Sequence, residues 1–277
     1  MILKATHTTT YLYSDPVSTC QTAVHLEPRS SEGQKLIDHK LEVTPAPAFT
    51  VTRTDYFGNR MTCFSIHQPH QTLTISSLST IDLRPEEPPA AALTPPWEQV
   101  RDAVAKDLIS EFTFRSPHTA SGEEFRSYAL PSFASRRPLF DAVQDLSHRI
   151  YTDFHYDPRA TTISTPVAEV LKSKQGVCQD FSHVMISCLR SMGLAARYVS
   201  GYLRSGANTR GAEASHAWCA AYCPGFGWLE FDPTNDVVPL AGHVRVAFGR
   251  DYSDVPPVNG VAVGGGEQLI NVSVRVV

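Results

Sequence analysis

The chain has 277 residues, which is enough for one large domain or two of modest size. Hydrophobic residues make up 42% of it and charged residues 19%, a composition typical of folded globular proteins that excludes extensive disorder. The net charge is −4 and no block of Lys or Arg is present, which argues against nucleic-acid binding.

Residues 1–84 predict an antiparallel β domain. Five segments in it are rich in Thr, Val, Ile and aromatic residues with roughly alternating polarity, as in strands with one buried face. The pair Gly58-Asn59 between two of these segments indicates a hairpin turn. We expect a β-sandwich here. The five segments are Ile2–Tyr13, Leu36–Thr44, Phe49–Phe57, Arg60–His67 and Gln71–Leu83.

A proline-rich segment at 85–96 separates this β region from a mixed α/β region at 97–277. Its five prolines remove backbone donors and favour extended conformations, which predicts a linker. After the linker, apolar residues recur at helical spacing, most clearly in Pro138–Tyr151. The last residues, Leu269–Val277, alternate between apolar and polar and predict a strand, which we assign to this second domain.

The middle of the second region predicts two helices and a strand. Thr165-Pro166 is a favoured pair for the start of a helix, so a short helix is expected over Pro166–Lys174. Gly176 ends it, and an apolar stripe predicts a second helix over Cys178–Met192. A strand should follow at 195–203.

Cys178 therefore lies at the N-terminus of a buried helix. Free backbone N–H groups and the positive end of the helix dipole favour thiolate over thiol at such a position. The same amides are able to stabilise an oxyanion formed when the thiolate attacks a carbonyl. An ordinary buried thiol is the alternative for a lone cysteine, and it is our interpretation of Cys20, Cys63 and Cys188.

A predicted hairpin supplies the partners that a thiol nucleophile needs. His216 stands at the start of one strand, and Asp232 at the end of the next, after a turn rich in Gly. Antiparallel pairing would bring the two side chains to the same end of the hairpin. An imidazole that takes and returns a proton, oriented by an acceptor on its other nitrogen, would complete a papain-like triad with Cys178.

These segments also carry a family resemblance. The stretches GVCQDFSH, RYVSGYL, SHAWCAAY and WLEFDPTN resemble the core of the transglutaminase-like superfamily over residues 145–240. The N-terminal β region and the C-terminal tail resemble bacterial proteins of this group. The resemblance implies a transglutaminase-like α+β catalytic domain behind the β domain. It also implies that Cys178 is the nucleophile, His216 the general base and acid, and Asp232 the residue that orients the imidazole.

Other polar and aromatic residues of these segments have competing interpretations. Tyr202 and Trp218 are candidates for substrate binding, with hairpin packing as the alternative for Trp218. Asp180 is expected to be a structural acceptor that ties the helix to its preceding loop. His216-x2-Cys219-x3-Cys223 is a poor zinc site, because alternate residues of a strand point to opposite faces. We expect no metal and no cofactor.

The predicted activity is acyl transfer through a thioacyl enzyme, with a peptide, a protein or a small amide as substrate. We expect hydrolysis, as in a peptidase or amidase, because water is abundant and no amine-binding feature is evident. A protein-glutamine transglutaminase and a non-catalytic binding or scaffold module on the same fold are the alternatives. No apolar run reaches the ~18 residues of a membrane span and no basic leader precedes one, so we expect a cytoplasmic protein without membrane or nucleic-acid partners.

Overall fold

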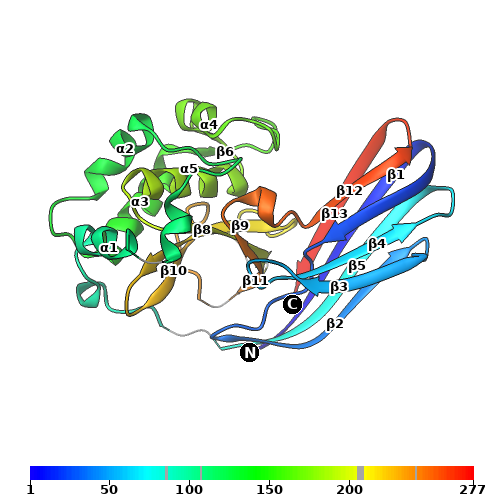
Figure 1. Ribbon diagram of the computed structural model, residues 1–277, viewed down its shortest axis with the longest axis horizontal. Coiled ribbons are helices and arrows are strands. Elements are labelled where there is room, and N and C mark those ends of the chain that lie inside the picture. The colour runs from blue at the N-terminus through cyan, green and yellow to red at the C-terminus, as the bar shows by residue number, and fades with distance from the viewer. Residues whose placement is uncertain (85–86, 107, 205–208, 241) are drawn as a thin grey trace.

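The computed structural model of the chain describes residues 1–84, 87–106, 108–204, 209–240 and 242–277. A long antiparallel sheet lies beside a mixed domain in which helices surround a smaller sheet (Figure 1). Part of the predicted linker, residues 85–86, lies outside the described residues. Among the described helices, none is long and apolar enough to cross a membrane.

The N-terminal sheet has seven strands in the order β2-β5-β1-β4-β3, with β12 and β13 also paired to β1. Thr, Val, Ile and aromatic residues with period-2 burial form these strands, as predicted. The first strand is much longer than expected, because the alternation continues beyond Tyr13. The strands are β1 (Ile2–Val24), β2 (Gln34–Thr44), β3 (Phe49–Thr54), β4 (Arg60–Ile66), β5 (His70–Leu83), β12 (Val258–Gly264) and β13 (Gln268–Val276).

This sheet is one curved layer, a half-barrel, and not the two separate sheets of a sandwich. The first half of β1 pairs with β5 and β13, and its second half pairs with β4 and β12. The bend falls at Pro16, at Pro69 between β4 and β5, and at Gly264–Gly266 between β12 and β13, where regular pairing is interrupted. A hydrophobic cluster that includes Val17, Phe64 and Ile75 draws on both halves. The predicted α+β class with an antiparallel N-terminal domain is confirmed.

Contrary to our expectation, the C-terminal tail does not belong to the second domain. The strand predicted at Leu269–Val277 is present as β13, but it pairs with β1 from Ala5 to Tyr13. Its alternating pattern predicts a strand with one buried face, but such a pattern cannot specify which sheet the strand joins. Since β1 has an edge that β4 and β5 leave free, the tail fills it, and the chain ends in the sheet in which it began (Figure 1).

The second domain has a four-stranded antiparallel sheet in the order β10-β9-β8-β11, with helix α5 packed on one face. The predicted helices and the hairpin are found within one or two residues of their expected ends. The strands are β6 (His155–Tyr156), β7 (Gln175–Gly176), β8 (Ala196–Leu203), β9 (His216–Cys223), β10 (Gly227–Phe231) and β11 (His243–Gly249). The helices are α1 (Trp97–Val104), α2 (Glu123–Ala129), α3 (Leu139–Asp153), α4 (Val167–Ser173) and α5 (Cys178–Ser191), with 3₁₀ turns at Ala91–Leu93, Leu108–Thr113, Leu130–Ser132 and Tyr252–Asp254.

The largest hydrophobic core joins the two domains. It contains the apolar face of α5 and also Leu3, Ile81 and Val276 from the N-terminal sheet. The inward-facing residues at the start of β1 and the end of β13 are therefore packed against the second domain. Apolar burial favours this contact, so the long sheet forms one wall of whatever site lies between the domains.

Candidate active site

The loop before α5 fixes Cys178 as the first residue of the helix. An Asp180 carboxylate oxygen, Oδ2, accepts hydrogen bonds from the backbone N–H of Val177 at 2.9 Å and the hydroxyl of Thr161 at 2.7 Å. Gly176 has φ +155°, and a Cβ there would lie 2.5 Å from the same oxygen. The loop thus requires glycine at 176 and the carboxylate at 180, which confirms the structural role predicted for Asp180.

The β9–β10 hairpin brings His216 and Asp232 together. Phe231 pairs with Cys219, so the next residue, Asp232, lies beside Trp218 and on the same sheet face as His216. The distance from His216 Nε2 to Asp232 Oδ2 is 2.8 Å, and both side chains are fully buried. The predicted proximity of the two side chains is confirmed, and the roles of base and orienting acceptor stay predictions.

Asp232 is held as an anion by five donors. Its Oδ1 accepts from the backbone N–H groups of Thr234 and Asn235, and its Oδ2 accepts from the side-chain amide of Asn235 and from two imidazoles. Burial alone would raise the pKa of this carboxyl, but the charge and hydrogen bond of His216, with a further contribution from His243, hold the pKa well below its usual range.

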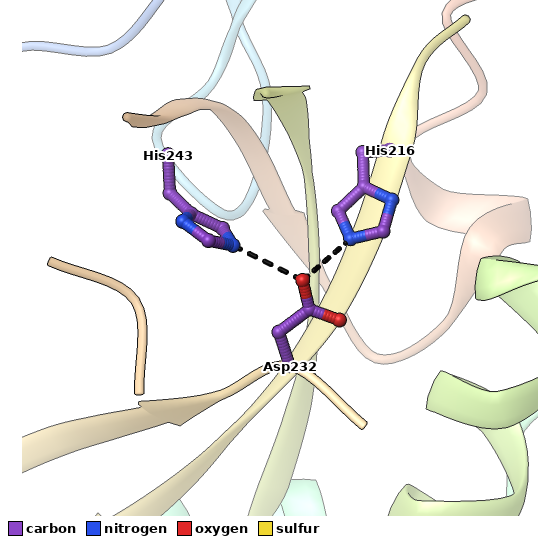
Figure 2. Close-up of side chains that lie close together, drawn as sticks. All are labelled: His216, Asp232 and His243. Atoms are coloured by element: carbon purple, nitrogen blue, oxygen red, sulfur yellow. Dashed lines mark hydrogen bonds and ion pairs between the residues drawn. The ribbon is translucent and has the colours of Figure 1, made fainter. Parts of the chain in front are cut away.

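His243 is the second imidazole on Asp232, and no sequence pattern indicated it. Its Nε2 lies 3.1 Å from the same Oδ2 that binds His216, and Figure 2 shows the two rings converging on that oxygen from different strands. His243 begins β11, which pairs with β8 and reaches Asp232 only across the sheet. No short motif links it to the rest of the site, so no local pattern could have identified it.

One nitrogen of His216 remains free for chemistry. Burial lowers the pKa of this imidazole, but Asp232 and, to a smaller extent, Cys178 outweigh burial and raise it to about 10. The opposite nitrogen, Nδ1, is buried, and among the described residues no group other than the Cys178 thiol hydrogen-bonds to it. Gly211 has φ +80°, and a Cβ there would lie 2.9 Å from that Nδ1. The site therefore holds the ring by Nε2 and leaves Nδ1 on the side of the thiol.

Cys178 and His216 line a cleft of about 400 Å³ between the two domains. Ser200 and two tyrosines, Tyr198 and Tyr252, contribute to its wall in the catalytic domain. The opposite wall comes from the N-terminal sheet and consists largely of the side chains of His7, Thr9, Tyr11, Ile270 and Val272.

Two phenols lie near the thiol. Burial raises the pKa of Tyr156 to about 12 and that of Tyr198 well above its usual value, and the charge of Cys178 adds to both shifts. Of the two side chains, Tyr198 lines the cleft. Neither residue was identified from the sequence as part of the site, although Tyr198 lies in RYVSGYL, one of the stretches that carry the family resemblance.

Tyr202 and Trp218 lie away from the cleft that holds Cys178. Trp218 is fully buried on the side of the hairpin that carries His216 and Asp232, where its ring contacts His243 at 5.1 Å and its Nε1 donates to Glu230. Tyr202 is buried with its ring 5.5 Å from that of His7. Neither is among the cleft-lining residues, and packing between strands and between domains occupies both rings, so substrate contact by Tyr202 and Trp218 stays a prediction that this geometry does not support.

The ligand atoms of His216, Asp232 and His243 lie within 4.8 Å of one another, so this group has a donor set that could hold a metal ion. Cys219 is not part of it, because it faces the α5 side of the sheet. A metal on this set would replace the hydrogen bond that orients His216. Within this group, the Asp232 carboxylate is an anion that already hydrogen-bonds to both imidazoles.

Comparison with known proteins agrees with this geometry. Residues 3–82 match the model of the bacterial transglutaminase-like N-terminal region, and residues 126–233 match that of the transglutaminase-like superfamily. An uncharacterized protein of Mycobacterium tuberculosis is 43% identical over 99% of this chain and 92% of its own length. A protein-glutamine gamma-glutamyltransferase of Pseudomonas aeruginosa is 30% identical over 31% of this chain and 15% of its own length.

A crystal structure of a Cytophaga hutchinsonii protein, described as a candidate cysteine protease, covers 100% of this chain and 90% of its own with a TM-score of 0.80 and 24% identity. That likeness establishes the shared fold of both domains. With the two family models and the full-length relative, it leads to one conclusion. The chain belongs to the transglutaminase-like superfamily, in the bacterial group that carries the β domain ahead of the catalytic core.

Proposed function

We propose that the protein is a cysteine-nucleophile enzyme that hydrolyses amide bonds through a thioacyl intermediate on Cys178. The observation that carries the proposal is the state of His216. Its ring is fixed by a buried carboxylate through Nε2, while among the described residues its buried Nδ1 has no hydrogen-bond partner other than the thiol of Cys178, which lines the same cleft. His7 and His70 are buried with one unpaired ring nitrogen as well, so what distinguishes His216 is its direct contact with the Asp232 carboxylate together with the nearby Cys178, which raises the pKa of the ring.

In the acylation step, the Cys178 thiol gives its proton to His216 Nδ1, and the resulting thiolate sulfur attacks the carbonyl carbon of the amide and forms a C–S bond. The carbonyl electron pair moves to oxygen, where the free backbone N–H at the start of α5 supplies one hydrogen bond and the Tyr198 hydroxyl a second. The tetrahedral intermediate then collapses and the C–N bond breaks. His216 Nδ1 delivers its proton to the departing amine.

In the deacylation step, the same nitrogen accepts a proton from water as the water oxygen attacks the thioester carbon. The C–S bond breaks, the acid product leaves, and Cys178 and His216 return to their starting states. Asp232 does not exchange protons in either step. Its low pKa keeps it anionic, so it stabilises the imidazolium that forms and keeps Nδ1 directed at the sulfur.

Amine transfer is the second candidate, and the Pseudomonas aeruginosa relative favours it because that protein is a protein-glutamine gamma-glutamyltransferase. The acylation step would be the same, and only the acceptor would differ. Incubation with β-casein, with and without monodansylcadaverine, separates the two outcomes. We expect new amino termini or released ammonia without the amine, and little dansyl incorporation with it. Dansyl incorporation that exceeds hydrolysis at millimolar amine would establish the transferase instead.

The chemistry itself is tested by alkylation. We expect iodoacetamide to modify Cys178 faster than Cys20 or Cys63 at pH 6–7, as assigned by mass spectrometry, and His216→Ala to remove this difference. A binding or scaffold module would show no such selective thiol. Equal alkylation rates at Cys178 and Cys63 in the wild type would therefore contradict the enzyme hypothesis and favour the hypothesis of a scaffold module.

A further inference from the structure

The outer edge of β13 carries backbone groups that are directed away from the N-terminal sheet. Lys4 and Val277 exchange both of their backbone hydrogen bonds, which fixes the pattern of the β1–β13 ladder. In an antiparallel pair such residues alternate with pairs whose N–H and C=O groups point outward. Thr9–Val272 and Tyr11–Ile270 are pairs of the outward kind.

This edge faces the catalytic domain. Val274, two residues beyond Val272 and equally directed outward, donates its backbone N–H to the carbonyl of Glu213 at 2.9 Å. Glu213 lies just ahead of the cleft-lining segment that leads to His216. One hydrogen bond of a strand-like pairing between β13 and the catalytic domain is thus already made, and it stops where the cleft begins.

The next two outward positions along β13 border the cleft itself. Ile270 and Val272 line the same cleft as Cys178 and His216, and the two side chains are 46% and 43% exposed. Among the described residues, no hydrogen bond is recorded for the outward backbone groups of either residue. No Pro or Lys lies in β13 to block the edge, although exposed edges are usually protected in that way.

We propose that β13 is the substrate-docking strand of this enzyme: an extended polypeptide adds to its free edge at Ile270 and Val272 and thereby places its scissile carbonyl at Cys178. The inference rests on the proposed acyl-transfer function and narrows its substrate to unfolded or extended polypeptide, in place of a small amide. Backbone hydrogen bonds to β13 supply affinity without sequence preference, and the apolar side chains of Ile270 and Val272 favour apolar residues at alternate positions of the substrate.

Residue-resolved amide hydrogen exchange tests the docking without requiring catalysis. The protein used is the full chain with Cys178→Ala, and the probe is a β-casein peptide of about twelve residues. On binding, we expect exchange at Ile270 and Val272 to slow by about tenfold or more, because their amides become donors to the peptide. Exchange at Asn271 and Ser273 should stay unchanged, because these amides already point to β1. A saturating peptide that leaves Ile270 and Val272 unprotected would overturn the proposal.

A proline substitution tests the same edge by affinity. In the Cys178→Ala background, Val272→Pro removes one outward N–H, and peptide affinity measured by fluorescence anisotropy should fall by about tenfold. Val272→Ala keeps the N–H and controls for the side chain. Ala262→Pro is the matched control, since Ala262 is an outward position on the same edge but in β12, away from the cleft. Equal affinities for Val272→Pro and Ala262→Pro would reject the docking strand.

These tests fail separately from the proposed chemistry. If Cys178 is selectively alkylated but the peptide does not bind or does not protect β13, the proposed enzymatic function is retained. The docking proposal then fails, and the substrate is not an extended polypeptide bound at β13. If the peptide protects β13 while Cys178 shows no selective reactivity, the edge is a binding site and the proposed hydrolysis is wrong.

Discussion

The buried polar groups at the two ends of helix α5 differ in how completely their hydrogen bonds are satisfied. Near its C-terminal end, Arg190 is 3% exposed and donates five hydrogen bonds, to groups on Phe112, Ser116, Thr119, Ala196 and Arg250. At its N-terminal end, Cys178 and His216 share a cleft, and in the part of the chain that the structure describes, His216 Nδ1 has no hydrogen-bond partner other than that thiol. Complete satisfaction stabilises a fold, whereas one unsatisfied nitrogen beside a thiol is available for reaction.

Two buried histidines, His183 within α5 and His216 beside its N-terminal end, differ in the direction of their pKa shifts. Burial lowers the pKa of His183 to about 3, and the nearby Asp251 compensates only in part. His216 is equally buried, yet its direct hydrogen bond to Asp232 outweighs burial and its pKa rises. Burial therefore does not decide the charge of an imidazole by itself, because direct contact with an ionised carboxylate reverses it.

The largest effect on activity is expected from Cys178→Ala, which removes the nucleophile. Hydrolysis of β-casein should fall by about a thousandfold or more, while the melting temperature stays close to that of the wild type because only one sulfur is lost. Measured residual activity above a tenth of the wild-type value would mean that another group carries the reaction.

Asp232→Asn should reduce kcat by about a hundredfold or more, because the neutral amide neither stabilises the imidazolium nor fixes the ring. The substitution also removes the charge that raises the His216 pKa. Fast alkylation of Cys178 should therefore require a higher pH than in the wild type. Unchanged kcat with an unchanged alkylation profile would show that the carboxylate is structural, as the Arg190 network is.

Arg190→Met is the converse test at the other end of the helix. Five hydrogen-bond acceptors lose their donor, and we expect a loss of about 3 kcal/mol or more in the free energy of unfolding. For a chain of this size that corresponds to a decrease of about 6–12 °C in the melting temperature. The kcat of the folded fraction should be nearly unchanged, and a large decrease in kcat would instead connect the network to catalysis.

His243→Asn should have a smaller effect, a decrease of about three- to tenfold in kcat with KM unchanged, because Asp232 keeps its other donors. His243 is a positioning residue, so its loss should also move the pH profile of Cys178 alkylation, though less than Asp232→Asn does. A merely structural role would lower the melting temperature without moving that profile.

The pH dependence of stability should have opposite signs for the two buried histidines. The pKa of His216 is raised from 6.5 to about 10, so its stabilising contribution is complete below pH 6.5 and is lost as pH rises toward 10. The pKa of His183 is lowered to about 3, so its contribution is complete above pH 6.5 and is lost as pH falls toward 3. Chemical unfolding of the wild type, His216→Gln and His183→Gln across this range measures both slopes, and slopes of the same sign would contradict the assignment.

Much of the site could be predicted from the sequence because its parts are local. Cys178 follows a glycine turn at a helix start, and His216 and Asp232 stand on two strands joined by a short turn, so their placement depends on pairing between near neighbours. The predicted helix and hairpin are confirmed within one or two residues. Nothing observed so far tests the catalytic roles of the three residues, which stay predictions until kinetics are measured.

The features that could not be predicted from the sequence depend on contacts between distant segments. The alternation in Leu269–Val277 determined a strand, but the free edge of β1 decided that the strand joins the first sheet, more than 200 residues away. In the same way, a period-2 pattern could not show that His243 contacts Asp232 across the sheet or that His7 and Val272 line the cleft. Local backbone preference and side-chain chemistry determined the elements and the reactive groups, whereas edge pairing and burial between domains decided how the cleft is enclosed.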